Sequence, residues 1–219
     1  MDTASIARLL QPFLVVPLSP EQLSYISIYI DILRRWNARL NLTGVRQPEE
    51  IVTRHFGESF FAAQRLFPGA PRDELRALDL GSGAGFPGLP LKLWAPKLPV
   101  TLIESNRKKT AFLREVIRAL ALTDIDVFSG RAEDYPAATA SLVTFRAVEH
   151  FEAALTAAGN LVLAGGRLAL LVGQPQAARL HDLAPAFDWA VAIPIPLSSQ
   201  RVLVVGTRRA VTSKEESDQ

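Results

Sequence analysis

The sequence predicts a doubly wound α/β fold of seven strands, with a terminal antiparallel hairpin and an N-terminal helical extension. Three observations support this prediction. Short apolar runs alternate with amphipathic helical patterns from about residue 75 onward, as in a parallel sheet covered by helices. The last two apolar runs are separated by too few residues for a parallel crossover. The residues before position 71 have a helical pattern throughout.

Residues 1–71 are expected to form the helical extension. Ser19 and Gln22 make a candidate capping box, with Pro20 in the first helical turn. Apolar residues then recur at helical spacing, and the helix is expected to end near Asn41. A second helix is expected over residues 48–66.

Residues 72–212 are expected to form the α/β domain, followed by a polar tail over residues 213–219. The predicted strands are 75–80, 100–104, 125–128, 142–145, 167–172, 189–195 and 201–206, and the predicted helices are 88–94, 107–122, 151–163 and 175–186. The last two strands are expected to pair as the hairpin.

Composition excludes several classes of function. Cysteine is absent, which excludes a disulfide framework, thiolate metal ligands and a cysteine nucleophile. The 24 Lys and Arg against 22 Asp and Glu give a net charge of +2, which neither predicts nor opposes a nucleic-acid partner. Charged residues interrupt every apolar run, and the first residues lack the basic start of a signal peptide. A cytoplasmic protein without a membrane partner is therefore expected.

The most informative segment follows the first predicted strand. Residues 79–88 read Asp-Leu-Gly-Ser-Gly-Ala-Gly-Phe-Pro-Gly. Glycines let the backbone approach a ligand, and the following helix start favours negative charge. The spacing from Gly83 to Gly88 also fits a dinucleotide fingerprint, so the glycines alone leave an NAD-type cofactor open. Asp79 favours a cofactor that carries an amino group, because a carboxylate would repel a pyrophosphate.

Other strand ends carry further candidate residues. Glu104 ends the second predicted strand, where a carboxylate can accept both ribose hydroxyls of an adenosine. Ala132 and Glu133 follow the third strand and are candidates for the adenine edge. Arg146 ends the fourth strand, at the sheet edge where α/β proteins bind ligands. An ion pair with Glu149 is the alternative role for Arg146.

Residues 79–88 resemble the cofactor loop of the class I S-adenosylmethionine-dependent methyltransferases. More narrowly, the Phe-Pro-Gly ending resembles the bacterial 16S ribosomal RNA guanine-N7 methyltransferases of the glucose-inhibited division protein B type. Further matches to that family are Trp36-Asn37, Asn41-Leu42-Thr43, Arg54-His55, Glu58-Ser59, Leu102 to Ser105, Lys108-Lys109, Phe112-Leu113, Arg131-Ala132-Glu133 and Arg146-Ala147-Val148. The resemblance extends over residues 19–206. This chain departs from the family at Glu58, where Asp is usual, and at Gly173-Gln174, where Lys-Gly is common.

The resemblance implies S-adenosyl-L-methionine as the cofactor, with contacts at Gly81, Phe86, Ala132, Glu133 and Arg146. Together with the loop and strand-end residues, the full predicted cofactor-binding set is Asp79, Gly81, Ser82, Gly83, Gly85, Phe86, Glu104, Ser105, Ala132, Glu133 and Arg146. Arg146 is also the predicted catalytic residue, and no metal ligand is predicted.

The residue types in the sequence are consistent with methylation of guanine N7. Pyrimidine C5 methylation generally needs a cysteine, and exocyclic amine methylation usually shows an Asn/Asp-Pro-Pro-aromatic loop where this chain has residues 144–147. Guanine N7 has a free lone pair and needs orientation rather than a base. We therefore predict methyl transfer to 16S ribosomal RNA or a small-subunit precursor, by a monomer that needs no metal.

Several alternatives stay open at this stage. They are a class I methyltransferase with another RNA or small-molecule substrate, an NAD-type oxidoreductase and a noncatalytic RNA-binding module. Basic residues crowd positions 107–118 and 34–46. They are equally compatible with phosphate contacts and with an ordinary solvated face.

Overall fold

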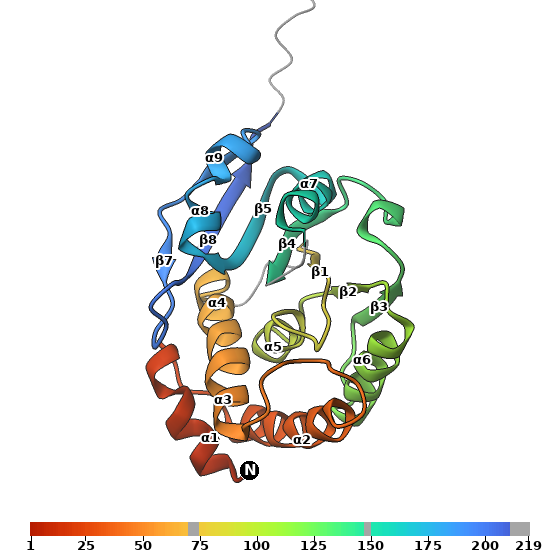
Figure 1. Ribbon diagram of the computed structural model, residues 1–219, viewed down its shortest axis with the longest axis vertical. Coiled ribbons are helices and arrows are strands. Elements are labelled where there is room, and N and C mark those ends of the chain that lie inside the picture. Colours follow the sequence, from red (N-terminus) through yellow and green to blue (C-terminus); the bar gives the residue numbers. More distant parts are fainter. Residues whose placement is uncertain (70–74, 147–149, 211–219) are drawn as a thin grey trace, which may run out of the picture.

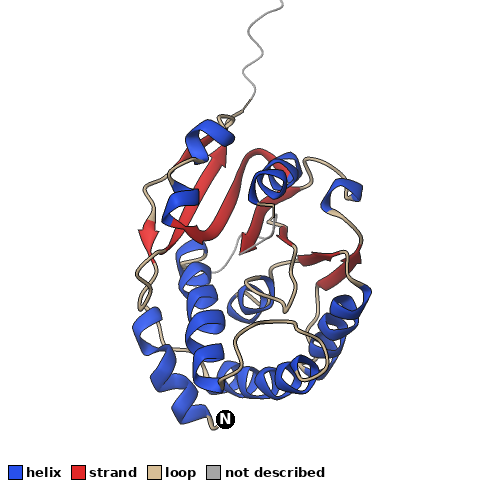
Figure 2. Ribbon diagram, in the orientation of Figure 1, coloured by secondary structure: helices blue, strands red, loops and turns tan. Residues whose placement is uncertain are grey.

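One mixed β-sheet organises the fold, and helices pack against it (Figures 1 and 2). The computed structural model describes residues 1–69, 75–146 and 150–210. The strands are β1 (Ala77–Leu80), β2 (Val100–Glu104), β3 (Ile125–Ser129), β4 (Ala140–Arg146), β5 (Val162–Gly173), β6 (Phe187–Trp189), β7 (Ile193–Pro194) and β8 (Arg201–Arg208). Their order in the sheet is β3-β2-β1-β4-β5-β8-β6, and β7 also pairs with β8.

The first five strands are parallel and β8 is antiparallel to its neighbours, so the predicted sheet and its antiparallel hairpin are confirmed. The sheet has eight strands in the described ranges rather than seven, because the predicted strand 189–195 is replaced by two short ones. Trp189 pairs with Gly206, whereas Ile193 pairs with Leu203. One extra residue therefore lies between β6 and β7, as in a β-bulge, and it divides the strand.

Helices make up the rest of the described chain. They are α1 (Thr3–Leu10), α2 (Pro20–Asn37), α3 (Pro48–Glu50), α4 (Glu58–Leu66), α5 (Gly88–Trp94), α6 (Arg107–Ala119), α7 (Phe151–Leu161), α8 (Gln174–Ala177) and α9 (Leu180–Leu183), with short 3-10 turns η1 (Gln11–Phe13) and η3 (Ala132–Asp134) and the π-helical η2 (Ile51–Gly57). The capping box at Ser19 is confirmed, although α2 ends at Asn37, before the expected Asn41.

Three helical predictions need correction. Residues 48–66 are helical, but the middle of the segment is the π-helical η2 rather than α-helix. The helix expected over 175–186 is two short helices, α8 and α9, and no helix-breaking residue stands between them. No separate helix is predicted over residues 3–10, which form α1; Asp2 caps it by accepting a hydrogen bond from the Ser5 N–H at 2.8 Å. Ile6 and Leu10 are buried on one face of α1, as in an amphipathic helix.

The N-terminal helices share a hydrophobic core with the α/β part. Residues of β1, β2, β4, β5 and β8 are divided between two separate clusters, so the clusters lie on opposite faces of the sheet. One cluster joins Ile30 and Phe56 of the N-terminal helices to Leu102 and Phe112. The predicted boundary at residues 71 and 72 and the predicted polar tail lie outside the described residues. What is described of the extension is thus packed on one face of the sheet.

Candidate cofactor and substrate site

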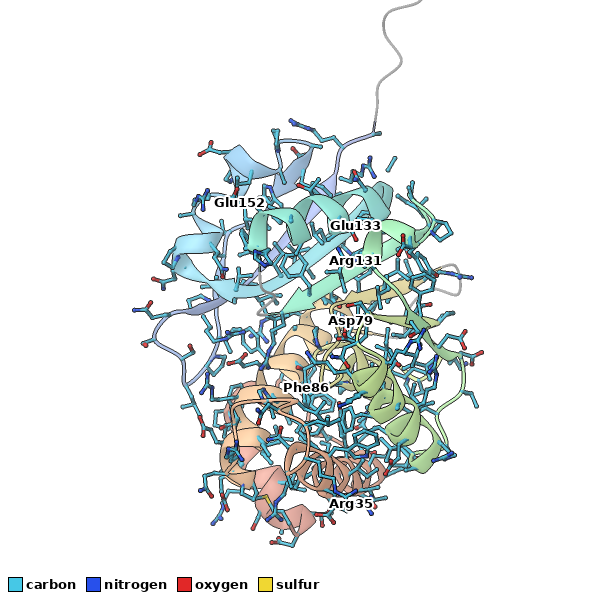
Figure 3. The ribbon with its side chains drawn as sticks, turned by 45° about the vertical axis from the view of Figure 1, so that its right-hand side comes forward. Arg35, Asp79, Phe86, Arg131, Glu133 and Glu152 are labelled. Atoms are coloured by element: carbon cyan, nitrogen blue, oxygen red, sulfur yellow. The ribbon has the colours of Figure 1, made fainter. Side chains whose placement is uncertain are left out.

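The predicted site residues gather at one edge of the sheet. Strands β3, β2, β1 and β4 are neighbours and parallel, so their carboxyl ends meet there. These ends lead, in the same order, into η3, Glu104 with Ser105, the loop 81–87 and Arg146. Asp79, Phe86, Arg131 and Glu133 can be found in Figure 3. Ligands of open α/β sheets bind at this edge, which makes it the candidate site.

The glycines of the loop 81–87 have two different functions. Gly81, Gly83 and Gly85 have φ angles of 63°, 55° and 86°, and a residue with a side chain adopts such angles only with strain. A Cβ atom on Gly83 would meet only the Gly81 carbonyl oxygen, at 3.6 Å, so this position faces open space. A Cβ atom on Gly85 would overlap the Tyr29 hydroxyl and the Leu89 side chain. Gly85 is therefore required for packing, whereas Gly83 leaves room for a ligand.

Glu104 holds the loop with a carboxylate that is 6% exposed. Its Oε2 accepts a hydrogen bond from the Gly83 N–H at 2.9 Å, and its Oε1 accepts one from the Asn106 N–H at 2.8 Å. A carboxylate has about four lone-pair sites, so it can accept about two further donors. Two neighbouring hydroxyl groups of a ribose would meet that capacity.

Asp79 is buried beneath the same loop, with 1% of its surface exposed. Its Oδ1 accepts a hydrogen bond from the Thr144 hydroxyl at 2.8 Å. Its Oδ2 makes no hydrogen bond of standard geometry among the described residues, although it lies close to the Gly88 backbone. Burial raises the pKa of Asp79 to about 6, against the opposing effect of its hydrogen bonds and of the Gly88 backbone. A buried carboxylate oxygen without a partner is rare in folded proteins. It fits a ligand that brings a cationic amino group to this loop.

Arg146 faces the N-terminal helices rather than open solvent. Its Nη1 donates to the Arg54 carbonyl oxygen at 2.7 Å and lies 3.4 Å from the Glu58 carboxylate. Its Nη2 donates to Nδ1 of His55. Burial lowers the pKa of Arg146 to about 10, so the side chain stays charged at neutral pH. The alternative partner Glu149 lies outside the described residues.

His55 is a neutral acceptor in this network. Burial, together with the nearby charge of Arg146, lowers the pKa of His55 to about 2. Since Nδ1 accepts from Arg146, we assign the proton to Nε2, which lies 2.7 Å from the Thr43 hydroxyl. Both ring nitrogens are engaged, so His55 is not poised to remove a proton from a substrate.

The other predicted residues differ in their surroundings. The Phe86 ring is buried in an aromatic cluster, stacked 5.4 Å from Tyr29 and 4.9 Å from His55. The Ser82 hydroxyl is buried and donates to the Asp79 carbonyl oxygen at 2.8 Å, which fixes the turn. Ala132 is buried in η3, whereas the Glu133 and Ser105 side chains are exposed at the rim of the site.

A comparison with protein-family models gives a match that covers most of the chain. Residues 22–196 match the family GidB, described as rRNA small subunit methyltransferase G. This range contains the loop, both buried carboxylates and Arg146. The chain belongs to this family.

Individual relatives agree with the family model. The chain is 38% identical to "Ribosomal RNA small subunit methyltransferase G" of Chloroflexus aggregans in an alignment 209 positions long, which covers 90% of this chain and 86% of that protein. It is 37% identical to the protein of the same name from Xylella fastidiosa, over 83% of this chain and 84% of that one. The resemblance to the GidB family drawn from the sequence is thus confirmed, and an NAD-type oxidoreductase is not supported.

Solved structures confirm the class of fold. A SAM-dependent methyltransferase from Aquifex aeolicus superposes with a TM-score of 0.59 at 16% identity, over 77% of this chain and 97% of that one. A predicted O-methyltransferase from Agrobacterium tumefaciens gives the same TM-score at 21% identity, over 70% of this chain and 82% of that one. The protein has the class I methyltransferase fold, and S-adenosyl-L-methionine is its cofactor.

Several members of the site were not among the predicted residues. Thr144 binds Asp79, and Tyr29 donates a hydrogen bond to the Ala84 carbonyl oxygen of the loop. From the sequence, Tyr29 is predicted only to lie within a helix. Glu58 is 4% exposed, and its Oε2 also accepts from Nε of Arg201 at 2.9 Å. Arg54-His55 and Glu58-Ser59 match the family in the sequence, with Glu58 in place of the usual Asp, but none of them is a predicted site residue.

Two kinds of feature are absent from the part of the chain that the structure describes. Within the described ranges, no three His, Asp or Glu side chains come together as a possible metal-binding group. None of the helices described here combines the length and the apolar character needed to cross a membrane.

Proposed function

We propose that this member of the GidB family transfers the methyl group of S-adenosylmethionine to N7 of a guanine in 16S ribosomal RNA. The observation that carries the proposal is the loop 81–87, which lies between two buried carboxylates, Asp79 and Glu104. Both carboxylates have unused acceptor capacity. The names of the relatives support small-subunit ribosomal RNA as the substrate.

The residues present fit the cofactor. Asp79 would attract its ammonium group, and Glu104 would accept its ribose hydroxyls. Gly83 would let the ligand pass close to the backbone, while Ala132 and Glu133 would border the adenine. Because the Phe86 ring is packed among protein side chains, we assign any cofactor contact of Phe86 to its main chain. When bound, S-adenosylmethionine supplies an electrophilic methyl group on a sulfonium.

The protein's chemical task is then to orient the guanine and exclude water. N7 has an in-plane lone pair, so its alkylation removes no proton from the nucleophile. The neutral, fully engaged His55 is consistent with a reaction that needs no general base. Orientation alone can supply ~7–11 kcal/mol of rate enhancement. We propose that Arg146 contributes to this orientation, since it ends β4 beside the loop and stays charged.

A methyl-transfer assay tests the proposal directly. Hypomethylated 16S ribosomal RNA, naked or in assembled small subunits, is incubated with the protein and tritiated S-adenosylmethionine. We expect one labelled nucleotide that nuclease digestion identifies as N7-methylguanosine. Label on another atom of guanine would refute N7 as the target, and binding of S-adenosylmethionine without transfer to either RNA would refute the substrate.

We further propose that the protein acts as a cytoplasmic monomer without a metal.

A further inference from the structure

The outer face of α6 carries a line of exposed arginines. Arg107, Arg114 and Arg118 stand at positions i, i+7 and i+11, which at 3.6 residues per turn fall on one side of a helix. All three are exposed, whereas Phe112 and Val116 on the opposite side are buried. A rise of 1.5 Å per residue gives the line a length of about 16 Å. We call Arg107, Arg114 and Arg118 the arginine line.

The acidic groups near the arginine line leave its charge largely uncompensated. Glu115 is the only acid in α6, and it is already engaged by Trp36 Nε1 at 2.8 Å and by Arg35 at 3.4 Å. No carboxylate of the described residues lies within 4.0 Å of a guanidinium of the arginine line. The positive charge of Arg35 on α2 thus offsets the negative charge of Glu115, which leaves the three charges of the arginine line without a carboxylate partner in α6.

The arginine line borders a groove at the end of the sheet. Strand β3 is the last strand of the sheet and pairs only with β2 in the described ranges. Between β3 and α6 lies a groove of about 620 Å³, lined by Arg114, Arg118 and Val127 among others. Asp126, on the β3 side, is the acid in this groove. A polyanion would therefore be held on the α6 side.

The arginine line starts at the candidate site. Asn106 caps α6 and donates its N–H to Glu104, and Arg107 is the next residue. We propose that the arginine line binds the phosphate backbone of the RNA that flanks the target guanine. This inference rests on the proposed function, because it takes RNA as the substrate. Arginine side chains suit this task, since each can donate two parallel hydrogen bonds to a phosphate.

The test compares two variants that lose the same charge. Arg114→Gln with Arg118→Gln removes two charges from the arginine line. Arg8→Gln with Arg179→Gln removes two exposed charges elsewhere. Arg8 lies on α1, and Arg179, which pairs with Glu152, lies beside α9 at the other end of the sheet from α6 (Figure 1). Binding of 16S ribosomal RNA is measured by fluorescence anisotropy from about 50 to 200 mM salt. S-adenosylmethionine affinity is measured by calorimetry, and circular dichroism checks folding.

We expect the Arg114/Arg118 variant to bind RNA at least about fivefold more weakly, with the slope of log affinity against log salt reduced by about 1.4, or about 0.7 per lost phosphate contact. S-adenosylmethionine affinity should not change, and the control variant should bind RNA like the wild type. Equal RNA binding by both variants would overturn the proposal that the arginine line binds RNA. It would leave the proposed methyl transfer by the wild type untouched. Selective loss of RNA binding without any wild-type transfer to N7 would support the arginine line and refute the proposed function. Failure of the wild type to bind RNA would overturn both.

Discussion

The Tyr29 hydroxyl of α2 donates a hydrogen bond to the Ala84 carbonyl oxygen inside the loop that we assign to the cofactor. Tyr29 is fully buried, and its ring stacks on Phe86 of the same loop. The N-terminal helices therefore support the loop directly. Burial raises the pKa of Tyr29, so its hydroxyl remains a donor at any physiological pH.

Tyr29→Phe should destabilise the protein and loosen the loop. The variant keeps the ring but leaves the buried Ala84 carbonyl without its donor, at a cost of about 1–3 kcal/mol. Urea unfolding measures the loss, and calorimetry should show weaker binding of S-adenosylmethionine. Unchanged stability together with unchanged affinity would show that the contact does not support the loop.

Gly83→Ala should fold and yet bind the cofactor poorly. Its methyl group enters open space, so the main structural cost is the left-handed backbone, about 1–2 kcal/mol. We expect at least tenfold weaker binding of S-adenosylmethionine, about 1.4 kcal/mol. Gly85→Ala is the contrasting variant, because its methyl group would overlap Tyr29 and Leu89 and should impair folding itself. Equal affinity of Gly83→Ala and wild type would mean that the loop is only a turn.

Glu104→Gln should weaken the binding of S-adenosylmethionine and of S-adenosylhomocysteine to a similar extent. The amide cannot accept on both sides, so it loses a charge-assisted hydrogen bond to the ribose, worth about 1.5–3 kcal/mol, and disturbs the contact with Gly83 or Asn106. S-adenosylmethionine and S-adenosylhomocysteine share the ribose, so their affinities should fall by similar factors in calorimetric titrations. A loss confined to one of them would contradict the assignment.

Asp79→Asn should stabilise the free protein at pH 8 while weakening cofactor binding. The folded pKa of Asp79 is about 6, against 3.8 in an exposed chain. The folded state therefore holds the proton more tightly, and the contribution of Asp79 to stability falls as pH rises from about 4 to 6. Asn carries no charge, so the gain of the variant should be on the order of 2 kcal/mol at pH 8 and vanish near pH 4. Urea unfolding across pH measures it, and parallel profiles for the two proteins would rule out the raised pKa.

Arg146→Lys should reduce methyl transfer while the fold persists. Lysine keeps the charge near Glu58 but lacks the planar fork that reaches both the Arg54 carbonyl oxygen and His55. We expect at least a tenfold lower single-turnover rate at saturating cofactor. Arg201→Lys is the matched control, because Arg201 contacts the same Glu58 carboxylate from β8. A near-normal rate for Arg146→Lys, or an equal loss of rate in the control, would show that Arg146 does not orient the substrate.

Much of the candidate site could be predicted because its signals are local. An acid, the three glycines of the loop 81–87 and a helix that starts at Gly88 follow one another within residues 79–88, and their order along the chain already defines a strand, a turn and a helix. Glu104 could be placed for the same reason, since it ends an apolar run. The carboxyl ends of neighbouring parallel strands meet at one edge of the sheet, and the structure brings the loop and Glu104 together there.

The sequence by itself thus determined the class of fold and the loop, because periodicity and glycine spacing act over a few residues. Only the tertiary structure decided what surrounds them. The partners of Arg146 in η2 and α4 are about ninety residues away in the chain, and Tyr29 is 55 residues from Ala84. The division of the last hairpin depends on its register with β8. Such contacts follow from how whole helices and strands pack, and that packing minimises the free energy of the complete core rather than of any one segment.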